Sequence, residues 1–166
     1  MVVLPDVLRD DLDVVFCGTA AGHVSAELGQ YYAGPGNEFW NVLSDAGFTP
    51  ETLRPCEFQR VLDYDIGLTD LNKEQSGRDD ELTRDGYDAT GLEQKVLSYR
   101  PRVLAFTSGT AAKKFYRRTK VPWGPQAKPI GETIVWVLPS TSAIARKHWP
   151  GLKHHWYELA KFLESG

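Results

Sequence analysis

Four short apolar segments alternate along the chain with segments of helical periodicity, and this alternation restricts the possible folds more than any other feature. Strands are predicted at Asp13–Gly18, Tyr64–Leu71, Arg102–Thr107 and Thr133–Pro139. Helices between such strands return the chain to the same edge of a sheet, so consecutive strands run parallel and helices cover both faces. The sequence therefore predicts an α/β fold with a mostly parallel central sheet.

The segments between the strands carry the helices and one long loop. Helices are predicted over residues 37–46, 88–98, 109–118 and 149–163, with a short helix or two turns over residues 52–62. Residues 72–86 are polar and contain Gly77, so they are expected to form a loop, and Trp123-Gly124-Pro125 is interpreted as a turn. The chain of 166 residues has no repeat, low-complexity tract or linker, which is typical of one domain spanning residues 1–166.

The composition argues against a membrane protein, a secreted protein and a metal-binding protein. No apolar run reaches the ~18 residues that a membrane span needs, and the segment before Asp13 is acidic, unlike a signal peptide. Cys17 and Cys56 form no metal-binding pattern, and His154 and His155 are expected to point in two directions from one helix. We therefore expect a cytoplasmic monomer with reduced thiols, no membrane contact, no cofactor and no metal.

The loops that follow the strands meet at one edge of the predicted sheet, where ligands of such folds bind. These loops span Gly18–Gly22, Thr69–Gly77, Thr107–Thr110 and Pro139–Arg146. The first consists of small residues, which let backbone N–H groups approach a ligand. The pair Tyr31-Tyr32 leads a Gly- and Pro-rich loop shortly afterwards and offers flat faces for stacking. This pattern predicts a pocket for a planar, polar ring.

Charge is distributed unevenly along the chain. Residues 1–94 contain 6 Lys and Arg and 19 Asp and Glu, whereas residues 95–166 contain 13 and 3, so the formal charges of the two parts are −13 and +10. One interpretation is two solvated faces that attract each other. The other is a basic face, built late in the chain, that binds a polyanion such as nucleic acid.

The loop after the fourth strand combines hydroxyls, one apolar side chain and basic residues. Hydroxyls such as those of Ser140 and Ser142 can hold phosphates, and Arg146 and Lys147 add positive charge. Ile144 is suited to insert between stacked bases. The alternative interpretation is an ordinary Ser/Thr-capped turn with Ile144 folded inward.

At five places in the correct order, the chain resembles the mismatch-specific uracil/thymine DNA glycosylases of the uracil-DNA glycosylase superfamily. The matching segments are Val15–Gly22, Tyr32–Trp40 with its Gly-Pro-Gly-Asn-x-Phe-Trp signature, Asp45–Thr49, Gly67–Leu71 and Trp136–Ala145. The resemblance implies a three-layer α/β/α sandwich. It also implies an enzyme that flips a damaged or mispaired base out of double-stranded DNA and hydrolyses its N-glycosidic bond.

The resemblance implies a base-binding pocket made of Gly18, Thr19, Ala20, Tyr31, Tyr32, Asn37 and Ser76. The first three match the loop that holds the catalytic water and contacts the flipped base. Tyr32 matches the aromatic residue that stacks on that base, and Tyr31 stands where some relatives have a histidine. Asn37 matches a signature position with a structural role, and Ser76 matches a hydroxyl further along the loop after the second strand.

The resemblance also implies the contacts with DNA. Ser140 and Ser142 match hydroxyls that grip phosphates. Ala143, Ile144 and Ala145 match the tip that fills the gap in the duplex and reads the orphaned guanine. The predicted DNA-binding segment therefore runs from Ser140 through these residues to the two basic side chains that follow.

The first motif departs from the family pattern Gly-x-Asn-Pro-Gly, because here it reads Gly18-Thr19-Ala20-Ala21-Gly22, and Ser140-Thr141 likewise replaces a usual Asn-Pro. An alanine side chain cannot hydrogen-bond a water molecule. Since N-glycosidic cleavage builds positive charge on the sugar, a carboxylate can stabilise that charge and activate water instead. Asp70, at a strand end, is the first candidate and Asp79 the second; the alternative for Asp70 is a helix cap or turn former with no catalytic role.

These observations predict a monofunctional glycosylase that excises uracil from G·U mispairs, with hypoxanthine and xanthine as further deaminated substrates. No lysine falls on the motif loops where an amine nucleophile is expected, so hydrolysis proceeds without a lyase step. One alternative is a catalytically inactive lesion-binding module, because Ala20 replaces the expected polar residue. Another is a hydrolase or binding protein for free nucleosides, which the basic second half of the chain disfavours.

Overall fold

The computed structural model describes residues 1–165 and contains a five-stranded sheet with the strand order β2-β1-β3-β5-β4. The strands are β1 (Val14–Gly18), β2 (Ile66–Asp70), β3 (Val103–Phe106), β4 (Gly124–Pro125) and β5 (Ile134–Val137). β1, β2, β3 and β5 pair in parallel, and β4 pairs antiparallel with β5. The predicted α/β fold with a mostly parallel sheet is confirmed.

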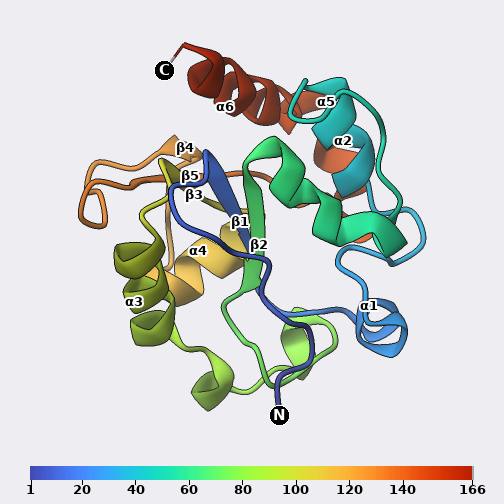
Figure 1. The fold of residues 1–166 in the computed structure, drawn as a ribbon. Coiled ribbons are helices and arrows are strands. Elements are labelled where there is room, and N and C mark those ends of the chain that lie inside the picture. The colour runs from blue at the N-terminus through green and yellow to red at the C-terminus, as the bar shows by residue number, and fades with distance from the viewer. Residues whose placement is uncertain (166) are drawn as a thin grey trace.

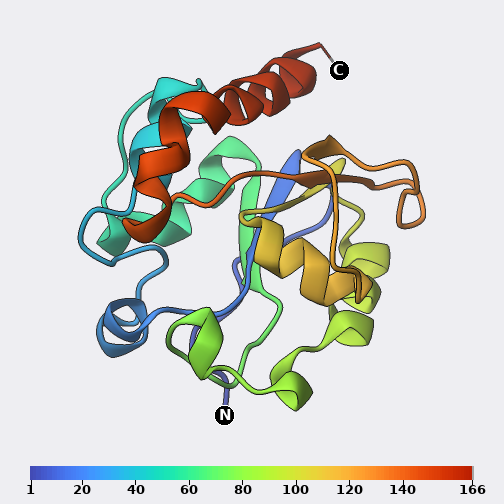
Figure 2. The ribbon, with the colours of Figure 1, turned by 180° about the vertical axis from the view of Figure 1, so that it is seen from behind.

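Helices cover both faces of the sheet and complete three layers (Figures 1 and 2). They are α1 (His23–Leu28), α2 (Phe39–Asp45), α3 (Ala89–Tyr99), α4 (Gly109–Tyr116), α5 (Trp149–Leu152) and α6 (His154–Glu164), with 3₁₀ helices at Pro55–Tyr64, Asp79–Glu81, Arg84–Gly86 and Ile144–His148. α2, α6 and the first 3₁₀ helix pack on one face, and α3 and α4 pack on the other. Figure 2 shows α4 lying across the second face, below the strand β5.

Alternating side chains of each strand supply the two cores. In β1, Val14 and Phe16 belong to the core under α2 and α6, whereas Val15 and Cys17 belong to the core under α3 and α4. Both faces are apolar because neither contacts water, which explains why the strands read as continuous apolar runs. The register sets Gly18 opposite Asp70 where β1 and β2 end.

The core under α6 also fixes the start of the loop after β5. Trp156 stacks on Phe16 with ring centroids 5.6 Å apart, and Phe39 meets Phe16 edge to face at 5.5 Å. The indole N–H of Trp156 donates a hydrogen bond of 3.0 Å to the carbonyl of Pro139. The last helix therefore holds the backbone from which Ser140 and its neighbours project.

The prediction missed two short elements and placed some boundaries incorrectly, each for a local reason. α1 has only six residues, too few for a periodic pattern, and β4 has two residues with Gly124 at φ 86°, so neither gives a strand or helix signal. The predicted closing helix is divided into α5 and α6 at Lys153, and α5 begins with Trp149-Pro150. The predicted loop 72–86 contains two short 3₁₀ turns. Within residues 1–165, no helix is long and apolar enough to cross a membrane.

Candidate active site

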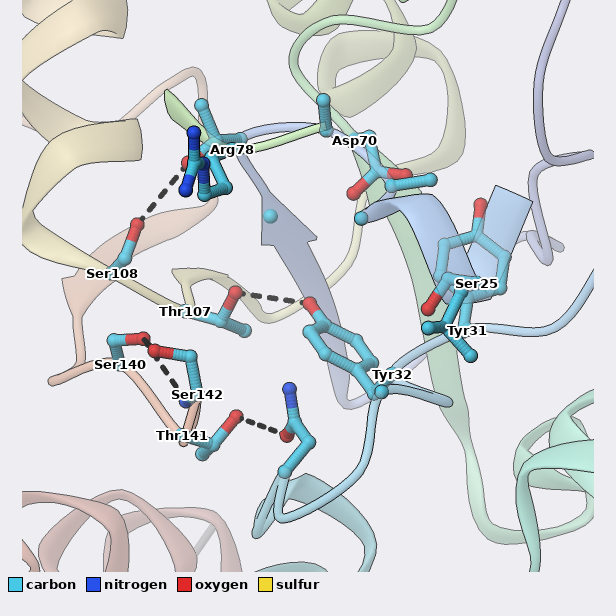
Figure 3. A pocket seen from close by; sticks show the side chains of 18 of the residues that line it. Ser25, Tyr31, Tyr32, Asp70, Arg78, Thr107, Ser108, Ser140, Thr141 and Ser142 are labelled. Carbon is cyan, nitrogen blue, oxygen red and sulfur yellow. Dashed lines mark hydrogen bonds between the residues drawn. The ribbon is translucent and has the colours of Figure 1, made fainter. Parts of the chain in front are cut away.

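The four loops that the sequence predicted to meet do so around one cavity of about 400 Å³ at the carboxyl edge of the sheet. Its wall includes Gly18–Ser25 after β1, residues 77–79 after β2, Thr107 and Ser108 after β3, and Ser140–Ser142 after β5. The Tyr31–Asn37 segment supplies the remaining side (Figure 3). This is the position at which folds with parallel sheets bind ligands.

Three polar side chains converge on Gly18 at the base of the cavity. A Cβ atom on Gly18 would lie 2.8 Å from Asp70 Oδ1, 3.1 Å from the Tyr32 hydroxyl and 3.5 Å from Thr107 Oγ1. The Tyr32 and Thr107 hydroxyls share a hydrogen bond of 2.9 Å. Gly18 is therefore required for close approach, because any side chain there would collide with the carboxylate that shares the site.

Asp70 is the buried carboxylate of this site. It ends β2, is only 6% exposed, and lies on the cavity wall. Burial raises its pKa to about 6, against the opposing charge of Lys73. Within residues 1–165, its carboxylate has no hydrogen-bond partner. A carboxylate with these properties changes its protonation state near neutral pH and can accept a proton from water.

Asp79 is the second predicted carboxylate, and it lies on the rim of the same cavity in a 3₁₀ turn. Partial burial raises its pKa, while the Thr110 and Thr19 hydroxyls act in the opposite direction. Both predicted acids therefore belong to the cavity, and they differ in depth, since Asp70 is buried and Asp79 is exposed to solvent.

Tyr32 has the geometry of a stacking platform. Its ring stacks on Phe39 with centroids 3.8 Å apart and an angle of 17° between the planes, and it lines the cavity. Its backbone is left-handed, with φ 53°, a conformation that is uncommon for a residue other than glycine. Phe39 supports one face of the ring, which leaves the cavity side for a ligand.

Tyr31 is buried, and its hydroxyl is held by two hydrogen bonds within the protein. Its side chain is 1% exposed, and its hydroxyl donates to the Pro5 carbonyl at 2.9 Å and accepts from Lys73 Nζ at 3.1 Å. Tyr31 lines the cavity as predicted, and its contact with a base stays a prediction.

Asn37 joins two loops that are distant in sequence. Its Oδ1 accepts hydrogen bonds from Thr141 Oγ1 at 2.8 Å and from the Phe39 amide at 3.0 Å. These bonds fix the orientation of the amide group. Among residues 1–165 its Nδ2 has no hydrogen-bond partner, and the residue lines the cavity. Asn37 therefore combines the predicted structural role with a donor that is free for a ligand.

Sequence reasoning placed one residue incorrectly and missed others. Ser76 is not among the described residues of the cavity wall: it pairs with the wall residue Ala21 in an isolated parallel bridge, and the next three residues of the chain line the cavity instead. Thr107, Ser108 and Arg78 were not predicted as site residues, although the first two lie in the loop Thr107–Thr110 assigned to this edge and Arg78 directly follows the loop Thr69–Gly77. The other pocket residues, Thr19 and Ala20, line the cavity as predicted.

The loop after β5 has features of both predicted arrangements, the DNA-binding loop with an exposed Ile144 and the Ser/Thr-capped turn. Ser140 Oγ donates to Ser142 Oγ at 3.1 Å and accepts from the Ser142 amide at 3.2 Å, as in a capped turn. Ile144, however, is 78% exposed beside the cavity, so the inward-folded alternative is wrong. It lies at the tip of the loop with Ala143 and Ala145 on either side.

The two basic residues of this loop differ in their contacts. Arg146 donates to Glu38 at 2.9 Å and to the Gly36 carbonyl at 3.1 Å, so its guanidinium holds the loop that contains Gly36, and its predicted contact with DNA stays a prediction. Gly36 is left-handed at φ 78°, and a Cβ atom there would lie 3.1 Å from the Ala143 side chain. Lys147 is exposed and has no ion-pair partner among residues 1–165.

Comparison with known proteins agrees with this geometry. The model of the uracil DNA glycosylase superfamily matches residues 5–160. The chain is also similar to the solution NMR structure of a candidate uracil DNA glycosylase from Methanosarcina acetivorans, with 23% sequence identity, a TM-score of 0.69 and 99% of each chain covered. Since the family model covers nearly the whole chain and the cavity lies where its fold binds ligands, the chain belongs to the uracil DNA glycosylase superfamily.

Proposed function

We propose that the protein is a monofunctional DNA glycosylase that flips a deaminated base, uracil in a G·U mispair first of all, out of double-stranded DNA and hydrolyses its N-glycosidic bond. The observation that carries this proposal is the convergence of Asp70, Tyr32 and Thr107 around Gly18, at the base of a cavity that also presents the free amide of Asn37. Membership of the uracil DNA glycosylase superfamily supports the same activity, and the similar protein from Methanosarcina acetivorans is itself a candidate uracil DNA glycosylase.

The flipped base enters the cavity and stacks on Tyr32, whose ring is held from behind by Phe39. Stacking on one aromatic ring is worth roughly 1–3 kcal/mol and favours any planar base. The Asn37 amide is placed to donate to a carbonyl oxygen of the base. Such a donor also stabilises the negative charge that develops on the leaving base.

The negative charge of Asp70 stabilises the positive charge that develops on the sugar in the chemical step. As the bond between base and sugar breaks, positive charge grows on the sugar, and the Asp70 carboxylate stabilises it while accepting a proton from the attacking water. The Ala20 methyl group cannot hold that water, so the buried carboxylate takes the role of the asparagine of the usual motif. No lysine lies on the cavity wall within residues 1–165, which supports attack by water without a lyase step.

The size of the cavity supports a wider range of substrates. Its volume of about 400 Å³ exceeds the space that one pyrimidine ring occupies, and Gly18 and Ala20 place little side-chain bulk in it. We therefore include hypoxanthine and xanthine among the deaminated bases. Beside the cavity, exposed Ile144 is suited to fill the gap that the flipped nucleotide leaves.

The test is a single-turnover assay on labelled duplexes that contain one G·U, A·U, T·hypoxanthine or C·xanthine pair, followed by alkaline cleavage at the abasic site. We expect strand cleavage of the G·U duplex and none of an undamaged duplex. Binding of these duplexes without cleavage of any base would establish an inactive lesion-binding module. Release of bases from free nucleosides but not from duplexes would establish a nucleoside hydrolase instead.

A further inference from the structure

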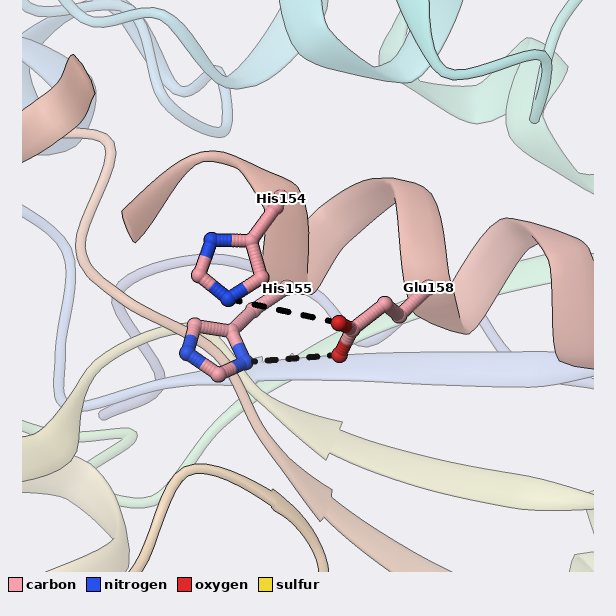
Figure 4. A group of neighbouring side chains, drawn as sticks. All are labelled: His154, His155 and Glu158. Atoms are coloured by element: carbon pink, nitrogen blue, oxygen red, sulfur yellow. Dashed lines mark ion pairs between the residues drawn. The ribbon is translucent and has the colours of Figure 1, made fainter. Parts of the chain in front are cut away.

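Three side chains with metal-binding atoms gather on the first turns of α6, and none of them belongs to the cavity wall. His154, His155 and Glu158 place their ligand atoms within 4.8 Å of one another. The His154 Nε2 atom lies 4.0 Å from Glu158 Oε1, and the His155 Nδ1 atom lies 3.6 Å from Glu158 Oε2. Figure 4 shows both imidazoles facing the carboxylate.

Helix geometry explains why these side chains converge. Successive residues of a helix point about 100° apart, which is why two adjacent histidines are expected to diverge. Glu158, however, follows His154 by four residues and His155 by three, and both spacings make neighbours on a helix surface. The two rings pack against each other with centroids 4.1 Å apart, and the carboxylate lies to one side of the pair and faces one nitrogen of each ring. The expectation that these histidines diverge is wrong.

Neither contact to Glu158 has the length of a hydrogen bond, because both exceed 3.5 Å. His155 Nδ1 is buried and has no hydrogen-bond partner among residues 1–165. A buried polar atom of this kind requires an explanation, and a bound ion is one of the few available. Zn²⁺ at 2.0–2.2 Å from nitrogen and oxygen in tetrahedral geometry places such atoms about 3.4 Å apart. The separation of His155 Nδ1 from Glu158 Oε2, 3.6 Å, is close to this value, and His154 Nε2, 4.0 Å from Glu158 Oε1, has to move inward by rotation of its exposed side chain.

The residues around the three side chains hold the His155 ring in place and leave a path by which an ion can enter from solvent. Trp123 packs against His155 with ring centroids 6.0 Å apart, and its indole also covers Gly109, where a Cβ atom would lie 3.2 Å away. An apolar support of this type restricts the orientation of a ligating imidazole. His154 and Glu158 are exposed, so an ion can reach the site from solvent.

We propose that His154, His155 and Glu158 form a binding site for one divalent transition-metal ion of the Zn²⁺ class. Imidazole and carboxylate ligands suit such ions, and two imidazoles with one carboxylate leave a fourth tetrahedral position for water. The site does not depend on the glycosylase activity, because its residues lie outside the cavity wall.

The test is a calorimetric titration of the full-length, chelator-treated protein with Zn²⁺, and with Co²⁺ to record visible absorption. We expect one ion per chain and the Co²⁺ bands of a four-coordinate site. Glu158→Gln and His155→Ala should each weaken binding at least ~10-fold, since even the loss of an outer partner of a metal ligand costs that much. Circular dichroism establishes that each variant is folded.

His148→Ala is the matched control, because it removes an exposed histidine from the preceding 3₁₀ turn and leaves the three ligands intact. It should bind Zn²⁺ like the unmodified protein. His154→Ala replaces His155→Ala as the decisive variant if loss of the ring beside Trp123 unfolds α6. The absence of saturable binding, or equal affinity in the unmodified protein and Glu158→Gln, would overturn the proposal.

Discussion

Asp70 is a buried carboxylate with a raised pKa, and its role can be tested by pH. As a general base it must be deprotonated, so the single-turnover rate should rise with pH through about 6 and then level off. Asp70→Asn should slow the chemical step by about 10² or more, remove this pH dependence and leave duplex binding nearly unchanged. Asp79→Asn is the matched control and should react at the rate of the unmodified protein. If Asp79→Asn alone is slow, Asp79 is the general base instead of Asp70.

The same carboxyl group should lower stability at alkaline pH. Its pKa is raised from 3.8 to about 6 in the folded protein, so its contribution to stability is fully present below pH 3.8 and is lost as the pH rises through about 6. Asp70→Asn has no charge to bury and should be more stable than the unmodified protein at pH 8, by up to about 3 kcal/mol. Urea denaturation at pH 8 and pH 3.5 measures this difference, which should vanish at the lower pH.

At the scale of elements, Asp6 connects the N-terminal segment, β2 and α3 behind the active site. Its carboxylate accepts from Thr69 at 2.6 Å, pairs with Lys73 at 2.9 Å and pairs with Lys95 at 2.6 Å. Burial alone would raise its pKa, but the bonds from Lys73, Lys95 and Thr69 outweigh burial and lower it. This network supports both ends of the site, because Thr69 precedes Asp70 and Lys73 bonds Tyr31.

Asp6→Asn should therefore destabilise the fold by about 1–3 kcal/mol at pH 7, since two ammonium groups lose their partner in a half-buried position. Because the pKa of Asp6 is lowered, its stabilising effect is present above pH 3.8 and is lost as the pH falls through the folded value. Urea denaturation at pH 7 and pH 3 measures both. Asp10→Asn, an exposed acid of the same segment, should be neutral, and equal losses in the two variants would contradict a specific network.

At the scale of the whole molecule, two groups of basic residues are relevant to DNA: one at the C-terminal end of α4 and one in the loop after β5. α4 starts at the cavity wall with Ser108 as its N-cap and runs away from the site, so Arg117 and Arg118 lie at its far end. Arg118 also covers the Tyr116 ring at 4.5 Å. Lys147 lies on the same 3₁₀ helix as Ile144, which lines the cavity, so it is better placed to meet a phosphate of a duplex whose flipped base enters the cavity.

Duplex affinity should fall steeply with salt, and Lys147→Ala should reduce the slope of log affinity against log salt by about 0.9, the value for one phosphate contact. Arg118→Ala changes the charge equally and should leave the slope unchanged. Fluorescence anisotropy with a fluorescein-labelled duplex at several salt concentrations gives both slopes. A flat dependence for the unmodified protein would exclude duplex DNA as its partner.

Strand periodicity and the direction of parallel strands were enough to predict the parallel sheet, the edge at which four loops meet and the presence of Asp70 there. Tyr32 was predicted from its Gly- and Pro-rich loop and from the resemblance to a known family. The contacts across those loops depended on packing between distant residues. Examples are the bond between Asn37 and Thr141, the capture of Arg146 by Glu38, and the displacement of Ser76 from the wall. The raised pKa of Asp70 likewise comes from burial by the assembled fold. Sequence spacing specifies which side chains share an element, whereas desolvation and pairing between elements exist only once the chain has folded.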